Sequence, residues 1–510
     1  MTDSLNKFEQ STQNLLSQIK ILLIKEVIFS LFLNLMYMIN NEVQSKRNYT
    51  VPLITITLLF FMWGFITCMN DILIPYLKQL FKLTFFESML VQFCFFGAYF
   101  IGSLIYFLVS TSSGDPINKV GYKKGILFGI FLAAFGCILF YPAATFSSYG
   151  LFLGALFVLG LGFTVLQITA NAYVSLLGSE DSASSRLNMT QAFNAFGTTI
   201  APVLGGHLIF EFFSADDGSF SAVATRIPYL IFAGILLLVA LLISRVKLPS
   251  FQTEEEEVVK GLGALQHTHL LFGVFAMFCY VGGEVAVGSF IISFLEQPQV
   301  MNLNEVVSKN YLSLYWGGAM IGRFLGAISL NHSISQSKKA LYMLGAAAAV
   351  FLVIFSIVDL TFSQISFFLV FIALNFVAFF VGKSAPARTL SIFAGINVLL
   401  LISAMLNHGE LAMYSILGIG IFNSIMFSNI YTLAISGLGR YTSQGSSLVV
   451  MAILGGAIVP IFQGYLADIF GVQHSFIIPV FCYVFILIFG AYCTKYLGHV
   501  KQDVDAKSGH

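Results

Sequence analysis

Charged side chains are scarce in this sequence. Asp, Glu, Lys and Arg together make up 10% of the 510 residues, whereas an ordinary soluble domain has about 25%. Hydrophobic residues make up 57% and aromatic residues 15%. These proportions exclude a soluble globular protein and predict a polytopic membrane protein. The net charge of +1, with no basic run beside the aromatic residues, gives no reason to expect a nucleic acid partner.

Sequence patterns of catalysis and of metal binding are also lacking. The chain contains no G-x-S-x-G, H-E-x-x-H or Walker loop. Its six cysteines lie inside apolar runs without C-x-x-C spacing, and its eight histidines lie mostly in loops without metal-ligand spacing. We therefore expect neither an enzyme nor a metal or redox site.

Long apolar runs fill the chain from Pro52 onward. In lipid such runs must be helices, because every backbone polar group has to find its partner within the segment. About 14 spans are predicted, near 52–77, 87–110, 122–142, 149–178, 187–213, 227–247, 268–296, 308–331, 338–358, 361–382, 387–406, 410–437, 444–470 and 475–497. Lys and Arg gather in alternate loops, for example at Lys123, Lys338 and Arg440. The positive-inside rule then places both termini in the cytoplasm.

The first 50 residues give the weakest pattern. Ile21 to Ile39 is apolar, but Lys25 and Glu26 interrupt it and leave too short a run for a span of about 20 residues. We expect residues 1–50 to be an extension carrying an interfacial helix, or an over-extended start of the reading frame. No small-residue cleavage site follows, so a secretion signal is not expected.

Repeated motifs divide the rest of the chain into two halves. Gly97 of the first half corresponds to Gly317 of the second, at an offset of 220 residues. The pair Asn171-x-Tyr173 recurs as Asn429-x-Tyr431, at an offset of 258. The change of offset predicts an inserted helical hairpin within about 332–388. Parallel six-helix repeats are typical of the major facilitator fold. We predict an all-α polytopic membrane protein of that fold, with two six-helix bundles and one added hairpin. The segments are a bundle at 51–247, a cytoplasmic linker at 248–267, a second bundle with the hairpin at 268–497, and a cytoplasmic tail at 498–510.

Two carboxylates lie inside predicted spans, Asp71 and Glu284. An ionised Asp at the centre of a membrane helix costs about 2.5 to 3.5 kcal/mol on insertion scales, so such a group is normally paired, neutralised or wet. Both are candidates for coupling transport to a cation, acting jointly or titrating separately. The structural alternative for Asp71 is an Asp that is hydrogen-bonded near the helix break at Pro75.

Amides and aromatic residues on the same helix faces are candidates for binding a neutral sugar. An amide offers donors and an acceptor, as a hydroxyl does, and an aromatic ring can stack on the apolar side of a pyranose. The alternative for each amide is a hydrogen bond between helices. The candidates are Asn70, Gln92, Gln167, Asn171, Gln191, Asn194, Tyr315, Trp316 and Asn423. Asp115 and Arg323 are candidate gating residues at the cytoplasmic face, with simple positive-inside anchoring as the alternative.

At these residues the chain resembles the fucose–galactose–cation symporter family of the major facilitator superfamily, and most of all its glucose/galactose branch. The matching segments include Phe61-Met-Trp-Gly-Phe65, Asn70-Asp-Ile-Leu-Ile-Pro75, Gln191-Ala-Phe-Asn194, Tyr280-Val-Gly-Gly-Glu284 and Tyr315-Trp-Gly-Gly-Ala-Met-Ile-Gly-Arg323. The resemblance implies that Asp71 stands at the position of the family's essential aspartate. Gln167 stands where the fucose permeases have an assisting glutamate. This difference makes Glu284 the stronger candidate for a second coupling carboxylate. Asn429 stands where the family usually has proline.

Residues and resemblance together predict import of a neutral hexose of the glucose/galactose type, in symport with a cation, by alternating access. The coupling ion, H⁺ or Na⁺, stays open, and no other cofactor is expected. N-acetylglucosamine, mannose and fucose are alternative substrates. An exporter of amphipathic compounds would need a more apolar cavity, and a non-transporting sugar sensor would need an output domain. We expect a monomer in the bacterial inner membrane, with the lipid bilayer and a small sugar as its partners.

Overall fold

The computed structural model describes residues 50–113, 116–177, 183–212, 221–249, 263–329, 336–383, 385–438 and 442–508. Within these ranges all regular structure is helical. Helices satisfy their own backbone hydrogen bonds, which is what an apolar chain in lipid requires. Residues 1–49, Asp115 and most of the predicted linker lie outside the described residues.

The first half of the chain forms the N-terminal bundle. Its elements are α2 (Thr50–Phe81), α3 (Phe85–Ser88), α4 (Leu90–Ser113), α5 (Pro116–Val120), α6 (Tyr122–Ile138), α7 (Phe140–Thr145), α8 (Tyr149–Leu176), α9 (Ala183–Gly206), the π-helix η2 (His207–Phe212), the 3-10 helix η3 (Ala222–Thr225) and α10 (Arg226–Arg245).

The second half forms the C-terminal bundle. Its elements are the 3-10 helix η4 (Gly263–Gln266), α11 (Thr268–Leu295), α12 (Glu305–Ser329), α13 (Gln336–Ile357), α14 (Phe362–Ser366), α15 (Phe368–Gly382), α16 (Pro386–Leu406), α17 (Gly409–Asn423), α18 (Met426–Ile435), α19 (Thr442–Met451), the 3-10 helix η6 (Ala452–Leu454), α20 (Gly455–Phe470), α21 (Val472–Ser475) and α22 (Ile477–Ser508). The last helix runs past residue 497, where the predicted span ends.

The spans agree with the predicted polytopic fold. Among the described residues, 11 helical segments are long and apolar enough to cross a membrane, and the pair α17 and α18, bent by 40°, makes a twelfth. Helices α9 and α12 have 24 and 25 residues, long enough to span, but they carry more polar side chains. Counting these two gives the predicted number of about 14, and the all-α membrane fold is confirmed.

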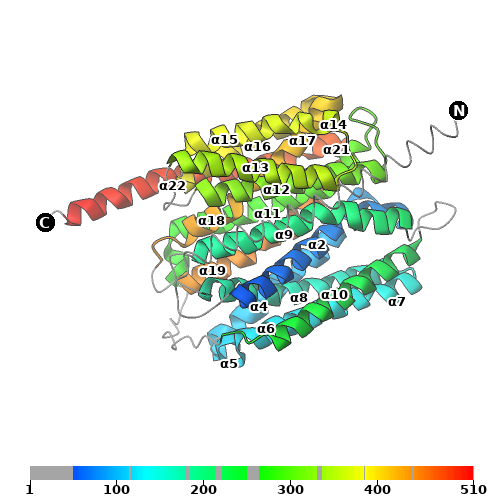
Figure 1. Cartoon of the computed structure of the whole chain (residues 1–510), viewed down its shortest axis with the longest axis horizontal. Helices are drawn as coiled ribbons and strands as arrows, with labels where there is room; N and C mark the ends of the chain where they lie inside the picture. Colours follow the sequence, from blue (N-terminus) through cyan, green and yellow to red (C-terminus); the bar gives the residue numbers. More distant parts are fainter. Residues whose placement is uncertain are drawn as a thin grey trace.

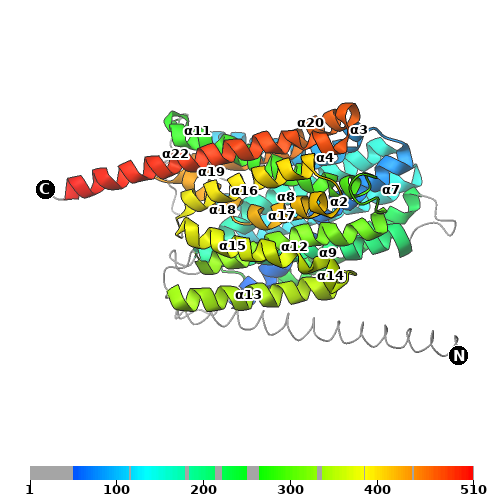
Figure 2. The same ribbon diagram turned by 90° about the horizontal axis from the view of Figure 1, so that it is seen from above.

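The helices lie roughly side by side in two bundles, and α22 projects beyond them at one end (Figure 1, Figure 2). Within the N-terminal bundle α2 packs against α9, and α8 packs against both α4 and α6. Within the C-terminal bundle α12 packs against α17, and α11 packs against α20 and α22. The two bundles meet where α9 contacts α12, α4 contacts α20, and α2 contacts α11.

The packing of α16 identifies the inserted helices. In the first bundle the third span, α6, packs against the fourth and the sixth, α8 and α10. In the second bundle α16 holds the same place, because it packs against α17 and α22. We infer that α16 is the third helix of the second repeat and that α13 together with α14 and α15 forms the inserted hairpin.

Glycines allow the helices that carry the polar candidates to approach closely. A Cβ atom on Gly64 of α2 would collide with the backbone of Asn194, and one on Gly420 of α17 would collide with the backbone of Tyr315. Small residues at such crossings let two membrane helices pack backbone to backbone. The crossings therefore fix the positions of Asn194 and Tyr315.

Candidate functional site

Asp71 lies in α2 at the junction of the two bundles, with 4% of its surface exposed. Its Oδ1 accepts hydrogen bonds from Gln92 Nε2 at 3.0 Å and Ser289 Oγ at 3.1 Å. Its Oδ2 accepts from Trp316 Nε1 at 3.2 Å, and Cys68 Sγ lies 3.7 Å away. The carboxylate is thus surrounded by hydrogen-bond donors.

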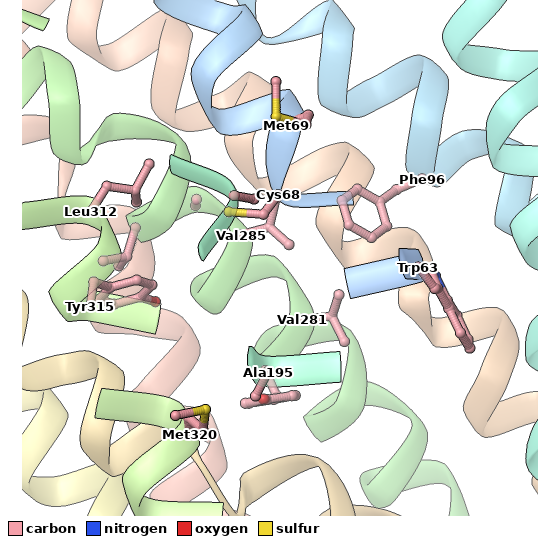
Figure 3. Packing of buried hydrophobic residues seen from close by; sticks show 14 of the residues in the cluster. Trp63, Cys68, Met69, Phe96, Ala195, Val281, Val285, Leu312, Tyr315 and Met320 are labelled. Atoms are coloured by element: carbon pink, nitrogen blue, oxygen red, sulfur yellow. The ribbon is translucent and has the colours of Figure 1, made fainter. Parts of the chain in front are cut away.

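The donors to Asp71 come from both halves of the molecule. Gln92 belongs to α4 of the N-terminal bundle, whereas Ser289 and Trp316 belong to α11 and α12 of the C-terminal bundle. Figure 3 shows the apolar side chains packed around this junction, among them Trp63 and Val285. The carboxylate of Asp71 therefore links the two bundles directly.

Gly288 leaves room for this link. A Cβ atom there would lie 3.1 Å from Cζ2 of Trp316 and 3.5 Å from Oδ2 of Asp71. The first distance is tighter than an ordinary van der Waals contact, so a larger residue would push the indole away from the carboxylate. The glycine before Ser289 is therefore part of the geometry that brings α11 to α2.

Glu284 lies one to two turns before Ser289 on α11 and is partly exposed. Its Oε1 accepts a hydrogen bond from Tyr280 at 2.8 Å, and its backbone carbonyl accepts one from the hydroxyl of Tyr315 at 3.1 Å. Arg323 interacts with Glu284 electrostatically, as Glu284 does with Asp71. The two predicted coupling carboxylates therefore belong to one electrostatic system.

Asn423 is the centre of a buried network in the C-terminal bundle. Its Oδ1 accepts from Asn397 Nδ2 at 2.8 Å and from the Tyr483 hydroxyl at 2.7 Å. Its Nδ2 donates to the Tyr315 hydroxyl at 3.0 Å. The Asn423 side chain is fully buried and ends α17 at the bend toward α18. Its amide is used to hold Tyr315, which in turn donates to the backbone of Glu284.

The remaining amides form a second polar line in the N-terminal bundle. Gln191 Nε2 donates to Asn171 Oδ1 at 3.4 Å, and Asn171 Nδ2 donates to the carbonyl of Gln167 at 3.1 Å. Asn194 Nδ2 donates to the carbonyl of Phe60 at 3.0 Å. Arg323 Nη1 of α12 donates to the carbonyl of Gln191 at 3.3 Å, so this line also reaches the C-terminal bundle.

The side chains next to Asp71 are sealed from solvent. Asn70 has no exposed surface and Gln92 has 2%. Asn70 Nδ2 lies 3.5 Å from Gln92 Oε1 and donates to it weakly. Access to this cluster therefore requires the two bundles to move apart.

A separate contact between the bundles lies at the predicted outer end. Asp468 of α20 accepts hydrogen bonds from the backbone N–H groups of Phe85 and Phe86 at 2.8 and 2.9 Å. These N–H groups begin α3 and would otherwise lack partners, because a helix leaves its first N–H groups unsatisfied. This contact joins the two bundles at the point where α2 turns back into α4.

The sequence did not single out Ser289, Asn397, Tyr483 or Asp468. Each is a common residue type inside or at the end of an apolar helix, and neutral polar residues carry no distinctive pattern there. The available signal for Ser289 is its place five residues after Glu284, on a helix already marked by a carboxylate.

Comparison with known proteins agrees with these observations. Residues 53–391 match the family model of the Major Facilitator Superfamily. The chain is 42% identical over 461 residues to the glucose/galactose transporter of Brucella abortus, covering 90% of this chain and 97% of the relative. It is 30% identical over 481 residues to the L-fucose-proton symporter of Escherichia coli, covering 90% and 96%. The crystal structure of that symporter in the outward conformation covers 88% of this chain and 99% of the solved chain, with 29% identity and a TM-score of 0.61.

The family model covers more than half of the chain, and both relatives are covered over nearly their whole length. The resemblance in sequence motifs is confirmed, and it is a resemblance to transporters, not to enzymes. The chain therefore belongs to the Major Facilitator Superfamily and, within it, to the fucose–galactose–cation symporter family.

Proposed function

We propose that this protein imports a neutral hexose together with a proton, by alternating access between its two bundles. The observation that carries the proposal is the Asp71 carboxylate, which accepts hydrogen bonds from Ser289 and Trp316 of the opposite bundle. Because the carboxylate lies at this contact, the strength of the contact between the two bundles depends on whether Asp71 is ionised or protonated.

The physical coupling follows from the strength of these bonds. A hydrogen bond to a charged group contributes about 1.5–3 kcal/mol, whereas a neutral one contributes about 0.5–1.5 kcal/mol. Protonation of Asp71 removes the charge and puts a donor where four donors already converge. Binding of a proton therefore weakens the contact between the bundles, and its release restores it.

The ring of donors favours a proton over Na⁺ as the coupling ion. Hard metal cations bind to several oxygen ligands, but the groups around Asp71 include the N–H groups of Gln92 and Trp316. A proton needs only one carboxylate oxygen. The name of the E. coli relative, a proton symporter, agrees with this choice.

The substrate class follows from the amides and rings near the junction. Gln167, Asn171, Gln191 and Asn194 offer the donors and acceptors that sugar hydroxyls need, while Trp316 presents an aromatic ring beside Asp71. The relative from Brucella abortus is named a glucose/galactose transporter, and one from Helicobacter pylori is named a putative glucose/galactose transporter. We assign a hexose of this type as the substrate, in the inner membrane of a bacterium.

Glu284 and Arg323 have the proposed roles of second coupling group and gate. Arg323 reaches the carbonyl of Gln191 across the junction and interacts with Glu284 within its own bundle. Because Arg323 contacts both bundles, a change in the charge of Glu284 can alter the contact of Arg323 with the N-terminal bundle.

The decisive experiment is uptake by the purified protein in proteoliposomes. Labelled glucose and galactose are supplied under an imposed pH gradient or an imposed Na⁺ gradient, with unlabelled fucose, mannose and N-acetylglucosamine as competitors. We expect accumulation of glucose or galactose driven by the pH gradient and abolished by a protonophore. Accumulation driven only by Na⁺ would refute proton coupling, and equilibration without accumulation would refute symport.

A further inference from the structure

Gln463 of α20 is fully buried, yet neither end of its side-chain amide has a hydrogen-bond partner among the described residues. Buried polar side chains are nearly always hydrogen-bonded, so an amide that is unpaired at both ends requires an explanation, such as a bound molecule or water. Gln463 lies in none of the clusters described above.

The contacts of α20 with α4 place Gln463 close to Gln92. A Cβ atom on Gly456 would touch the ring of Phe96, and one on Gly464 would touch Met89. Gln92 lies on α4 between Met89 and Phe96. Residues three or four apart share a helix face, so this stretch of α20 lies against the face of α4 that carries Gln92.

The contacts of α20 with α11 place Gln463 near Ser289. Val459 packs against Gly282, and Gln463 follows Val459 by one turn. Ser289 follows Gly282 by two turns and so lies on the same face of α11. Gln463 is therefore directed into the junction of α4 and α11, where Gln92 and Ser289 bind Asp71.

A second orphaned atom belongs to the same junction. Asn70 Oδ1 is buried and has no partner among the described residues, although Asn70 Nδ2 lies against Gln92. The junction thus offers one unused donor, Gln463 Nε2, and two unused acceptors, Gln463 Oε1 and Asn70 Oδ1. The N-terminal bundle supplies one of these atoms and the C-terminal bundle supplies two.

We propose that Gln463 is a sugar-binding residue that recognises two adjacent hydroxyl groups, with Asn70 completing the subsite from the opposite bundle. An amide presents a donor and an acceptor side by side, and two neighbouring hydroxyls present the complementary pair. The inference rests on the proposed sugar transport and deepens it by naming a subsite. A sugar held there lies next to Gln92, which donates a hydrogen bond to Asp71. Gln92 would therefore connect the bound sugar to the carboxylate that takes up the proton.

The test measures equilibrium binding to the purified full-length protein by calorimetry. The probes are glucose, galactose and their single-position deoxy analogues. A site built to bind a hydroxyl strongly rejects the analogue that lacks it. We therefore expect the wild-type protein to show a loss of affinity at two adjacent positions of the ring.

The informative variant is Gln463→Leu, of similar size and without the amide. We expect hexose affinity to fall about tenfold, as for one or two lost neutral hydrogen bonds, and the loss at the two adjacent positions to disappear. Gln463→Glu keeps the shape of the side chain and one acceptor. We therefore expect this variant to lose discrimination against the deoxy analogue at only one of the two positions. It replaces the leucine variant as the test if that variant does not fold. Asn375→Leu removes another buried amide, on α15, and should leave the pattern of losses unchanged.

The outcomes separate the two proposals. If both Gln463 variants keep the wild-type pattern of losses, Gln463 holds only water or packing contacts and the subsite is refuted. If the wild-type protein binds none of these hexoses, the proposed function itself is refuted, and the subsite with it.

Discussion

Replacing Asp71 with asparagine tests the coupling mechanism most directly. Asparagine keeps the shape of the side chain but can neither carry a charge nor take up a proton near neutral pH. Its amide oxygen can still accept from Gln92 and Ser289. Its amide nitrogen, however, then faces Trp316 Nε1, which donates to a carboxylate oxygen at 3.2 Å in the native protein.

The magnitude follows from the two bonds that cross between the bundles. The bond from Ser289 changes from charge-assisted to neutral and loses about 1 kcal/mol, and the bond from Trp316 is lost at about 2 kcal/mol. The sum of about 3 kcal/mol shifts the equilibrium toward separated bundles roughly 150-fold. Proton-driven accumulation disappears as well, because the coupling group no longer titrates.

The assay compares two modes of transport in proteoliposomes. With one proton per sugar, a gradient of one pH unit supports accumulation up to about tenfold, since each unit is worth about 1.36 kcal/mol. We expect the wild type to approach that value and Asp71→Asn to stop at equal concentrations inside and outside. Counterflow, which needs the bundles to move but no net proton transfer, should persist in the variant.

The matched control is Cys68→Ala, which removes a weak thiol contact to the same carboxylate at 3.7 Å and leaves its charge. The control should accumulate sugar as the wild type does. If Asp71→Asn also concentrated sugar about tenfold, the assignment of Asp71 as the coupling group would be wrong.

Three further predictions concern positions outside the proposed sugar site. Burial, followed by the charge of Glu305, raises the pKa of the Glu296 carboxyl from 4.5 to about 8; the folded state keeps this proton longer than the unfolded state, so stability falls as the pH rises from about 4.5 to about 8. Glu296→Gln should flatten the pH dependence of Tm across that window, and an unchanged slope would contradict the prediction. Asp468→Ala removes the acceptor for the N–H groups of Phe85 and Phe86, while Thr84 still caps α3. We expect the outer contact to weaken by about 0.5–2 kcal/mol and the distance between spin labels on α3 and α20 to increase, whereas Asp468→Asn, which keeps an acceptor, should change that distance less. Asn375, on α15 of the inserted hairpin, donates to the carbonyl of Ile421 at 3.3 Å, near the bend between α17 and α18. Asn375→Leu removes this donor and should lower Tm without changing which sugar hydroxyls are recognised. A Tm equal to that of the wild type would show that this bond from the hairpin does not stabilise the bend.

The carboxylate at the junction of the two bundles was predictable because a charge inside a membrane helix is costly. Asp71 stands out in an apolar span, and so does Glu284. Ser289 and Gln463 do not, since a single neutral polar residue is common in such helices. Ser289, nearly 200 positions away in the chain, meets Gln92 through a hydrogen bond. Gln463, more than 370 positions away, lies on a helix that packs against α4.

The candidate amides show the same limit. Sequence spacing places Gln191 and Asn194 on one helix face, but the structure uses Asn194 to bond the backbone of Phe60, while Gln191 bonds Asn171. Asn423 was a candidate sugar ligand, and its amide is engaged with Asn397, Tyr483 and Tyr315. Their roles in sugar binding stay predictions.

The sequence by itself determined the membrane class, the helical spans, the two repeats and the presence of an added hairpin. These properties depend on local hydropathy, on the need of each backbone group for a partner in lipid, and on spacing along the chain. Only the tertiary structure decided which helix of the added region belongs to the repeat and which polar side chains meet around Asp71. Those outcomes depend on how each helix is rotated and how closely its glycines let a neighbour approach, and no single helix carries that information.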